Sequence, residues 1–173
     1  MTEERYHQIY LSPIGEISLV ANSQALLGAW FHGQKYQLRG FEETVFLEAS
    51  NPVLQATCDW LTAYFSGIDL PALPPLNPQG TEFQQKVWRE LLKIDLGQTS
   101  TYGQIAKSLN CKSAQAIGGA VGKNSISILI PCHRILGSDA SLTGYAGGLE
   151  RKLYLLALEK ERNEKVQKLR EME

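Results

Sequence analysis

A proline-rich segment divides the chain into two parts that differ in character. Residues 70–80, LPALPPLNPQG, contain four prolines, so they can form neither a regular helix nor a central strand. We expect a semi-rigid linker there, between an N-terminal domain at 1–69 and a C-terminal domain at 81–173. Residues 1–80 carry three Lys and Arg against eight Asp and Glu, whereas the rest of the chain carries fourteen against ten. A polyanion would therefore bind the second part.

The first part has the pattern of a small antiparallel sheet covered by a helix. Strand-like runs occur at 6–11, 16–20 and 25–31, and turn-forming residues separate them. From Pro52 to Phe65 the apolar residues recur at helical spacing, and Gly67 follows the last of them. We expect an α+β fold, in which this domain precedes a mostly helical one.

The second part has the pattern of a helical domain with a helix-turn-helix. A capping box at Thr81 and Gln84 predicts the start of a helix with one apolar face, which continues up to a stop at Gly97. We assign Trp88 on that face to the core. Two short helices, at 102–109 and 114–122, follow around the polar turn 110–113. Helix pairs are common, so this spacing by itself leaves both a structural and a DNA-binding interpretation open. The expected domain is winged-helix-like.

The second helix of this pair contains two adjacent glycines, Gly118 and Gly119. Each costs about 1 kcal/mol relative to alanine in mid-helix, so we expect the backbone there to approach another surface closely. That surface is either a neighbouring helix or a nucleic-acid groove, which such a helix would bind with little sequence preference. Lys112, Lys123 and Arg134 are placed to meet phosphates, although solvation is the usual state of surface charges.

Length and composition exclude several classes of protein. No apolar run in the 173 residues approaches the roughly 20 needed to cross a membrane, and the polar start predicts a cytoplasmic protein. The cysteines Cys58, Cys111 and Cys132 are odd in number and widely spaced, which indicates neither a disulfide framework nor a cysteine zinc site. His7 and His32 lack ligand partners in the sequence. We expect no metal.

The most distinctive stretch surrounds Cys132. An apolar run at 128–130 ends at Pro131, and Cys132, His133 and Arg134 follow. Pro131 suits the first position of a helical turn, which would place the thiol beside unpaired amide donors, an imidazole and a guanidinium, and so favour its thiolate. A lone cysteine is more often a small buried apolar residue, but charged neighbours favour a reactive one. Because adjacent side chains diverge, His133 would act on the sulfur through a bridging water.

A long helix follows, from Leu149 to about Arg170. Its charged end, after Glu159, should be solvated. Before it, residues 137–140 predict a turn, and Gly144–Gly148 a loop whose backbone N–H groups could face a ligand. The stripe expected to be buried comprises Leu149, Leu153, Leu156 and Ala157.

The residues around Cys132 resemble the acceptor-cysteine motif of a known family, the O6-alkylguanine-DNA alkyltransferases (methylated-DNA--protein-cysteine methyltransferases). The resemblance runs from about Thr81 to Glu159 and includes Asn124 and Gly144–Gly148. It implies DNA repair by single-turnover transfer of a methyl or larger alkyl group from O6-alkylguanine to Cys132, leaving an S-alkylcysteine. O4-alkylthymine is a candidate second substrate. It also implies a monomer that acts on double-stranded DNA and needs no cofactor.

The resemblance further implies roles for single residues. His133 would deprotonate Cys132, Glu159 would orient His133, and Asn124 would tie the active-site turn together. The target nucleotide would be flipped out of the duplex into a pocket. Tyr102 would donate a hydrogen bond to the purine there, and backbone groups of Ile135 and Ala146 would read its edge. Further pocket positions are Tyr145 and Lys152.

One position departs from the family pattern. Where members usually have an arginine that fills the vacated base stack, this chain has Gln115. We therefore expect retained chemistry with weaker DNA affinity or flipping. Three other functions remain open: a binding protein that recognises the lesion without reacting, a Cys-His hydrolase, and a DNA-binding regulator that uses the helix pair alone.

Overall fold

The computed structural model describes residues 3–137 and 144–172, so three residues of the turn expected at 137–140 lie outside its described part. The chain forms two compact units. The first comprises Met1–Gly80 and Ser125–Leu129, and the second comprises Thr81–Asn124 and Ile130–Glu173. Within the described residues, no helix has the length and apolar character needed to span a membrane.

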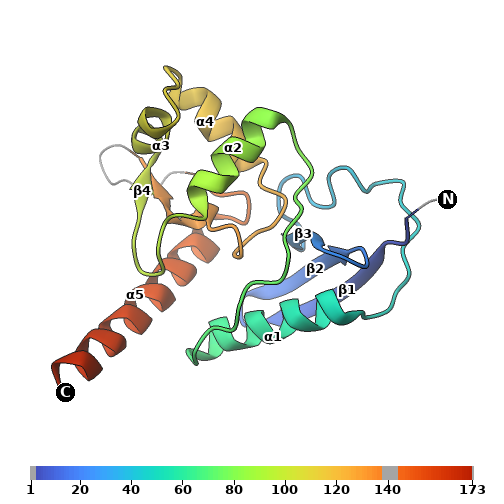
Figure 1. Ribbon diagram of the computed structural model, residues 1–173, viewed down its shortest axis with the longest axis horizontal. Helices are drawn as coiled ribbons and strands as arrows, with labels where there is room; N and C mark the ends of the chain where they lie inside the picture. The colour runs from blue at the N-terminus through green and yellow to red at the C-terminus, as the bar shows by residue number, and fades with distance from the viewer. Residues whose placement is uncertain (1–2, 138–143, 173) are drawn as a thin grey trace. The chain divides into compact units, whose positions relative to one another are not determined.

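The first unit is a three-stranded antiparallel sheet with one helix against it (Figure 1). The strands β1 (Tyr6–Ser12), β2 (Gly15–Ala21) and β3 (Leu26–Phe31) are hydrogen-bonded in chain order, and the helix α1 (Pro52–Ser66) packs against all three. Asn51 caps the first turn of α1, as its position before a proline favours. The α+β fold expected from the sequence is confirmed.

Two extended segments from elsewhere in the chain cover the free edge of β3. Leu26 pairs in parallel with Leu76 of the proline-rich segment, and Ala29 pairs in parallel with Ile126. The Leu26 N–H donates to the Pro75 carbonyl at 2.8 Å, a bond that a proline can accept although it cannot donate. The sheet edge is thereby occupied. The stretch just before the cysteine motif consequently belongs to the first unit.

Among its described residues, the second unit contains four α-helices, one turn of 3-10 helix and a short parallel strand pair. The helices are α2 (Glu82–Leu91), α3 (Tyr102–Ser108), α4 (Ala114–Gly122) and α5 (Leu149–Glu171). The strand β4 (Ser100–Thr101) pairs in parallel with β5 (Ile135–Leu136). Both predicted capping boxes are present, at the starts of α2 and α3.

Trp88 is a core residue, as the sequence predicts. Its ring is 1% exposed, and its Nε1–H donates to the Ala120 carbonyl at 2.9 Å, which fastens α2 to α4. A buried indole needs such a partner for its N–H. This hydrogen bond holds α4, the second helix of the predicted pair, against α2.

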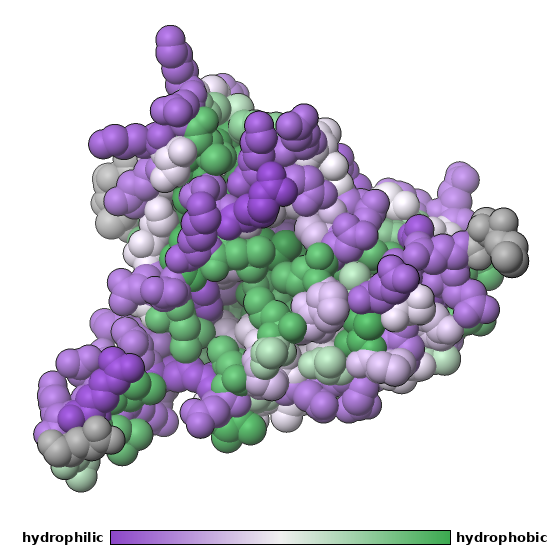
Figure 2. Space-filling model, in the orientation of Figure 1, coloured by the Kyte–Doolittle hydropathy of each residue, from purple (hydrophilic) through white to green (hydrophobic). Residues whose placement is uncertain are grey.

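The buried face of α5 differs from the predicted leucine stripe. Leu149 and Leu153 are 48% and 49% exposed, whereas Lys152, Leu155 and Glu159 are buried. Lys152 and Glu159 can face inward because they have polar partners there, which a count of apolar residues cannot reveal. The part of α5 after Glu159, called its outer part below, carries mainly hydrophilic side chains, as Figure 2 shows.

Candidate active site

Cys132 begins a single turn of 3-10 helix, η1 (Cys132–Arg134), directly after the buried Pro131. Pro131 precedes this turn instead of occupying its first position, and the Cys132 N–H already donates to the Ile130 carbonyl at 2.8 Å. The Cys132 N–H is therefore already paired and is not a free donor for the sulfur. Burial raises the pKa of Cys132 to about 11, against the opposing effects of the Asn124 hydrogen bond and the Lys152 charge. The expected resting thiolate is thus corrected: the free protein holds a neutral thiol.

Asn124 holds the turn closed from the end of α4. Its Nδ2 donates to the Ile130 carbonyl at 2.9 Å and to Cys132 Sγ at 3.1 Å. The residue is 4% exposed, so both bonds lie in a dry environment, where they fix the sulfur firmly. The predicted tie between Asn124 and the cysteine turn is present in the structure.

His133 and Glu159 form a buried pair between η1 and α5. The distance from His133 Nε2 to Glu159 Oε2 is 2.5 Å, and the two side chains are 0% and 1% exposed. Burial by itself raises the pKa of Glu159, but His133, through its hydrogen bond and through its charge when protonated, and the hydrogen bond and charge of Arg134 lower it to about 2. Burial lowers the pKa of His133, and the nearby carboxylate only partly offsets this. At neutral pH the pair is a carboxylate beside a neutral imidazole.

This charge state fixes the tautomer of His133. An ionised carboxylate only accepts hydrogen bonds, so Nε2 must carry the proton that points to Glu159. The lone pair of the neutral ring then lies on Nδ1. That atom is buried, and no hydrogen-bond partner for it occurs within residues 3–137 and 144–172. A buried, basic nitrogen on the residue that follows the cysteine can accept the thiol proton through a bridging water.

Lys152 is a buried cation of α5 whose charge acts on Cys132. Its side chain is fully buried, and Nζ donates to the Ile135 carbonyl at 2.5 Å. Burial lowers the pKa of Lys152, while the charge of a Cys132 thiolate would raise it. An ammonium here stabilises negative charge on sulfur.

The pairing of β4 with β5 connects the cysteine turn to α3. Thr101 is opposite Leu136, and Tyr102, the first residue of α3, follows at once. The half-buried Tyr102 ring lies against α4, where a Cβ added to Gly118 would be 3.8 Å from it. A Cβ at Gly119 would meet no other described atom within 4 Å. A methyl group at Gly118 would therefore make only ordinary contact with Tyr102, so packing between the helices does not require glycine there, and Gly119 leaves bare backbone at the surface.

The remaining predicted site residues lie at or near the surface. Gln115 is exposed in the first turn of α4, and Lys123 is half-buried at its C-terminal end. Tyr145 and Ala146 are half-buried in a turn closed by a 2.9 Å bond from the Gly148 N–H to the Tyr145 carbonyl. The Tyr145 ring is edge-on to the His133 ring, with centroids 6.4 Å apart.

The expected phosphate contact of Arg134 is corrected. Its side chain is 9% exposed, and Nε donates to Glu159 Oε1 at 2.6 Å. Nη1 donates to the Ile94 carbonyl at 2.7 Å. The guanidinium is therefore part of the protein interior, which residue type alone could not indicate.

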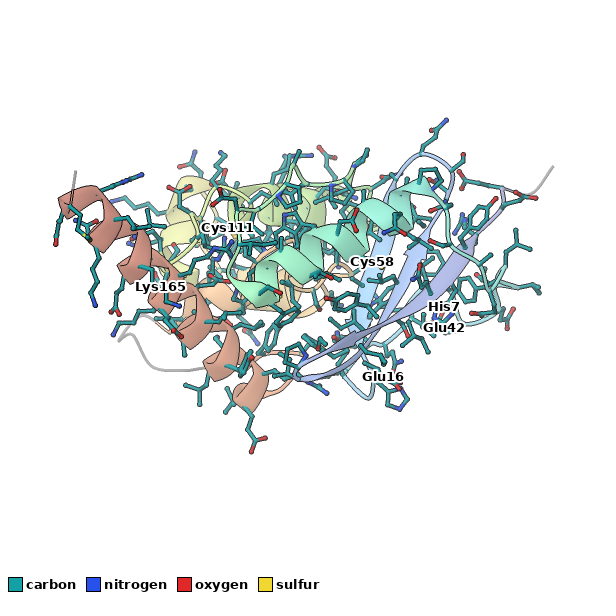
Figure 3. The ribbon with its side chains drawn as sticks, turned by 90° about the horizontal axis from the view of Figure 1, so that it is seen from below. His7, Glu16, Glu42, Cys58, Cys111 and Lys165 are labelled. Atoms are coloured by element: carbon teal, nitrogen blue, oxygen red, sulfur yellow. The ribbon has the colours of Figure 1, made fainter. Side chains whose placement is uncertain are left out.

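The other two cysteines lie elsewhere, Cys58 on α1 and Cys111 in the turn between α3 and α4 (Figure 3). His7, also labelled there, is 2.7 Å from a carboxylate oxygen of Glu48. In the described ranges, no group of three or more His, Cys, Asp or Glu side chains could hold a metal ion.

A helix-turn-helix joined to a cysteine with a buried His-Glu pair defines a class of protein, DNA-binding proteins with a reactive cysteine. Residues 82–161 match the family model "6-O-methylguanine DNA methyltransferase, DNA binding domain". Residues 5–77 match the model of that family's ribonuclease-like domain. The chain belongs to the O6-methylguanine DNA methyltransferase family.

Individual relatives cover nearly the whole chain. This chain is 41% identical over 157 residues to the methylated-DNA--protein-cysteine methyltransferase of Haemophilus influenzae. The matched stretch covers 90% of this chain and 86% of that relative. The Methanosarcina acetivorans protein of the same description is 41% identical over 160 residues, covering 89% and 97%. A crystal structure of Mycobacterium tuberculosis OGT in complex with DNA is similar with a TM-score of 0.81 and 37% identity, over 91% of this chain and 94% of that one.

Proposed function

We propose that this protein binds DNA and repairs O6-methylguanine in it by moving the methyl group onto Cys132. The activity is that of a methylated-DNA--protein-cysteine methyltransferase, the description its relatives carry. The observation that supports Cys132 as the acceptor is its place in the site. Its sulfur is hydrogen-bonded to Asn124, and the neighbouring His133 has its basic nitrogen buried and its other nitrogen on Glu159.

The reaction uses the neutral thiol and the neutral imidazole of the free protein. The thiol proton passes to His133 Nδ1, through a bridging water, and Glu159 stabilises the imidazolium that forms. Sulfur then attacks the methyl carbon, so that an S–C bond forms while the bond from carbon to O6 breaks. The electron pair leaves with O6, where the Tyr102 hydroxyl donates a hydrogen bond or proton to the guanine. The thioether cannot be hydrolysed, so each molecule reacts once.

The lesion reaches the sulfur by base flipping, because O6 is stacked inside a duplex. The exposed, side-chain-free backbone at Gly119 permits close approach of α4 to DNA with little dependence on sequence. Backbone groups of Ile135 and Ala146 would read the purine edge. The Ile135 carbonyl, which accepts from Lys152 Nζ, has a second lone pair for this purpose. We extend the proposal to larger O6-alkyl groups and to O4-alkylthymine.

The free thiols indicate the compartment in which the protein works. All three cysteines of the described residues are unpaired, and a reactive thiol persists best in a reducing compartment. Every proposed catalytic side chain comes from the second unit of one chain. We therefore place the protein in the cytoplasm as a monomer, with residues 81–173 as its alkyltransferase domain.

The test is mass spectrometry after mixing the protein with duplex DNA that contains one O6-methylguanine. We expect one added methyl on the peptide that contains Cys132, in an amount that never exceeds the protein present. An unmodified protein that still binds the lesion would indicate a recognition protein. Release of free product over many turnovers, with DNA dispensable, would indicate a Cys-His hydrolase.

Gln115→Arg tests the departure at the start of α4. Gln115 is exposed, and an arginine there adds a charge at the proposed DNA surface. We expect duplex affinity to rise by about tenfold at 0.1 M salt, and the salt dependence to steepen by about 0.9 in log-log slope. The matched control is Gln167→Arg, which adds the same charge on the exposed outer part of α5. Equal affinities for the Gln115 variant and wild type would refute this placement of α4.

A further inference from the structure

We propose that Arg134 is a positioning residue for methyl transfer, which clamps the Glu159 carboxylate and thereby holds the His133 ring with Nε2 on that carboxylate. The inference rests on the proposed function of Cys132 and assigns a role to the fourth residue of the Pro-Cys-His-Arg motif. It replaces the phosphate contact that the sequence indicated.

The geometry of the clamp has three points of attachment. One carboxylate oxygen of Glu159 accepts from Arg134 Nε at 2.6 Å, and the other lies 2.5 Å from His133 Nε2. Arg134 is itself held, because its Nη1 donates to the Ile94 carbonyl at 2.7 Å. A planar guanidinium with two such bonds fixes the plane of the carboxylate, and the carboxylate then fixes the ring of His133. Rotation of that ring would displace Nδ1, the proposed acceptor of the thiol proton.

Removing Arg134 would raise the pKa of both Glu159 and His133. The guanidinium lowers the pKa of Glu159 and also lowers the pKa of His133. Lys152 from α5 is the other cation that lowers the pKa of His133. The helix α2 also packs against η1, and its buried side chains contain no titratable group. Without Arg134, both Glu159 and His133 would bind protons at higher pH, and the base would be lost sooner on acidification.

Burial separates this role from a phosphate contact. A side chain that is 9% exposed and bonded to a buried carboxylate cannot reach DNA without breaking the bond. A phosphate contact would tolerate lysine, because an ammonium also binds phosphate. The clamp would not, because one ammonium cannot reproduce the planar fork that reaches both Glu159 and Ile94.

The experiment compares Arg134→Gln and Arg134→Lys with wild type and with the control Lys165→Ala. Lys165 is a solvated residue of the outer part of α5 (Figure 3), so the control removes one positive charge outside the site. For each protein we would measure the single-turnover rate of methyl transfer against pH, the affinity for lesion-containing duplex, and its salt dependence.

For Arg134→Gln we expect the acid limb of the rate profile to move up by about one pH unit or more, since a neighbouring cation shifts a carboxyl pKa by 1–3. For Arg134→Lys the limb should stay in place while the plateau rate falls severalfold. Both should bind duplex within about twofold of wild type, as should the control. If Arg134→Gln fails to fold, the rate loss of Arg134→Lys at unchanged affinity still decides the question.

Three outcomes would overturn the proposal. One is weaker duplex binding by Arg134→Gln, with a salt slope reduced by about one and an unmoved acid limb. Another is wild-type rate and binding in Arg134→Lys. The third is an equal rate loss in both variants with the wild-type pH profile, which indicates a merely structural role. Absence of methyl transfer by the wild-type protein would instead refute the proposed function, so the two failures are distinguishable.

Discussion

Replacing Cys132 by alanine is expected to abolish methyl transfer and to leave binding of lesion-containing duplex within about twofold of wild type. The methyl carbon must bond to a sulfur, and only this cysteine lies beside the buried His133 and Glu159 pair in the described structure. The side chain removed is small and 6% exposed, so the proposed DNA surface on α4 should persist. Intact-mass measurement and a duplex titration on the same sample check both halves of the prediction.

Cys58→Ala and Cys111→Ala are the matched controls. Each removes a thiol that lies outside the site, and each should retain one methyl per protein. Transfer that persists in the Cys132 variant would place the acceptor elsewhere. A protein whose function depends on the helix pair alone would show no functional change in any of the three variants.

Replacing Glu159 by glutamine is expected to lower the single-turnover rate by about 10²–10⁴-fold, the usual contribution of general acid-base catalysis. The amide can donate as well as accept, so His133 is no longer held with its proton on Nε2. The imidazolium that forms during transfer also loses its counter-charge. Arg134 is left buried without an anion, which should lower the free energy of unfolding by about 3–5 kcal/mol.

The same substitution should change how stability depends on pH. The pKa of Glu159 lies at about 2 in the folded protein, below its ordinary value of 4.5. A carboxylate with a depressed folded pKa contributes stability that is full above pH 4.5 and is lost as pH falls toward 2. The buried pair should therefore lose about 3 kcal/mol over this window in wild type. Denaturant unfolding at pH 5 and pH 3 covers most of the window and should show a loss of about 2 kcal/mol.

Glu159→Gln should show a smaller acid loss than wild type between these two pH values, because an amide does not titrate. Glu161→Gln is the control, since Glu161 is an exposed residue of α5 only two positions away. That variant should keep the wild-type rate and the wild-type acid loss. An unchanged transfer rate in Glu159→Gln would show that His133 needs no carboxylate, and the mechanism would then be wrong.

Helix boundaries were largely predictable because their signals are local. The helix α4 runs from Ala114 to Gly122 as expected, with Ser113 as its N-cap, and α3 and α5 end within a residue or so of their predicted limits. Capping residues act on backbone groups a few positions away, so the sequence alone contains both partners. The short strands β4 and β5 were missed, because two residues carry no periodic pattern and their pairing joins distant segments.

The amino-acid sequence by itself determined the α+β fold, most helices and the family, because these depend on local patterns and on a compact motif. The reactive residues that it indicates stay predictions. Only the tertiary structure decided which face of α5 is buried, how Arg134 is used and which form of the thiol is stable. Each of these depends on partners brought together from far apart in the chain. Glu159 faces inward because it is paired there with His133 and Arg134. Cys132 stays protonated because burial destabilises its thiolate more than the Asn124 hydrogen bond and the Lys152 charge stabilise it.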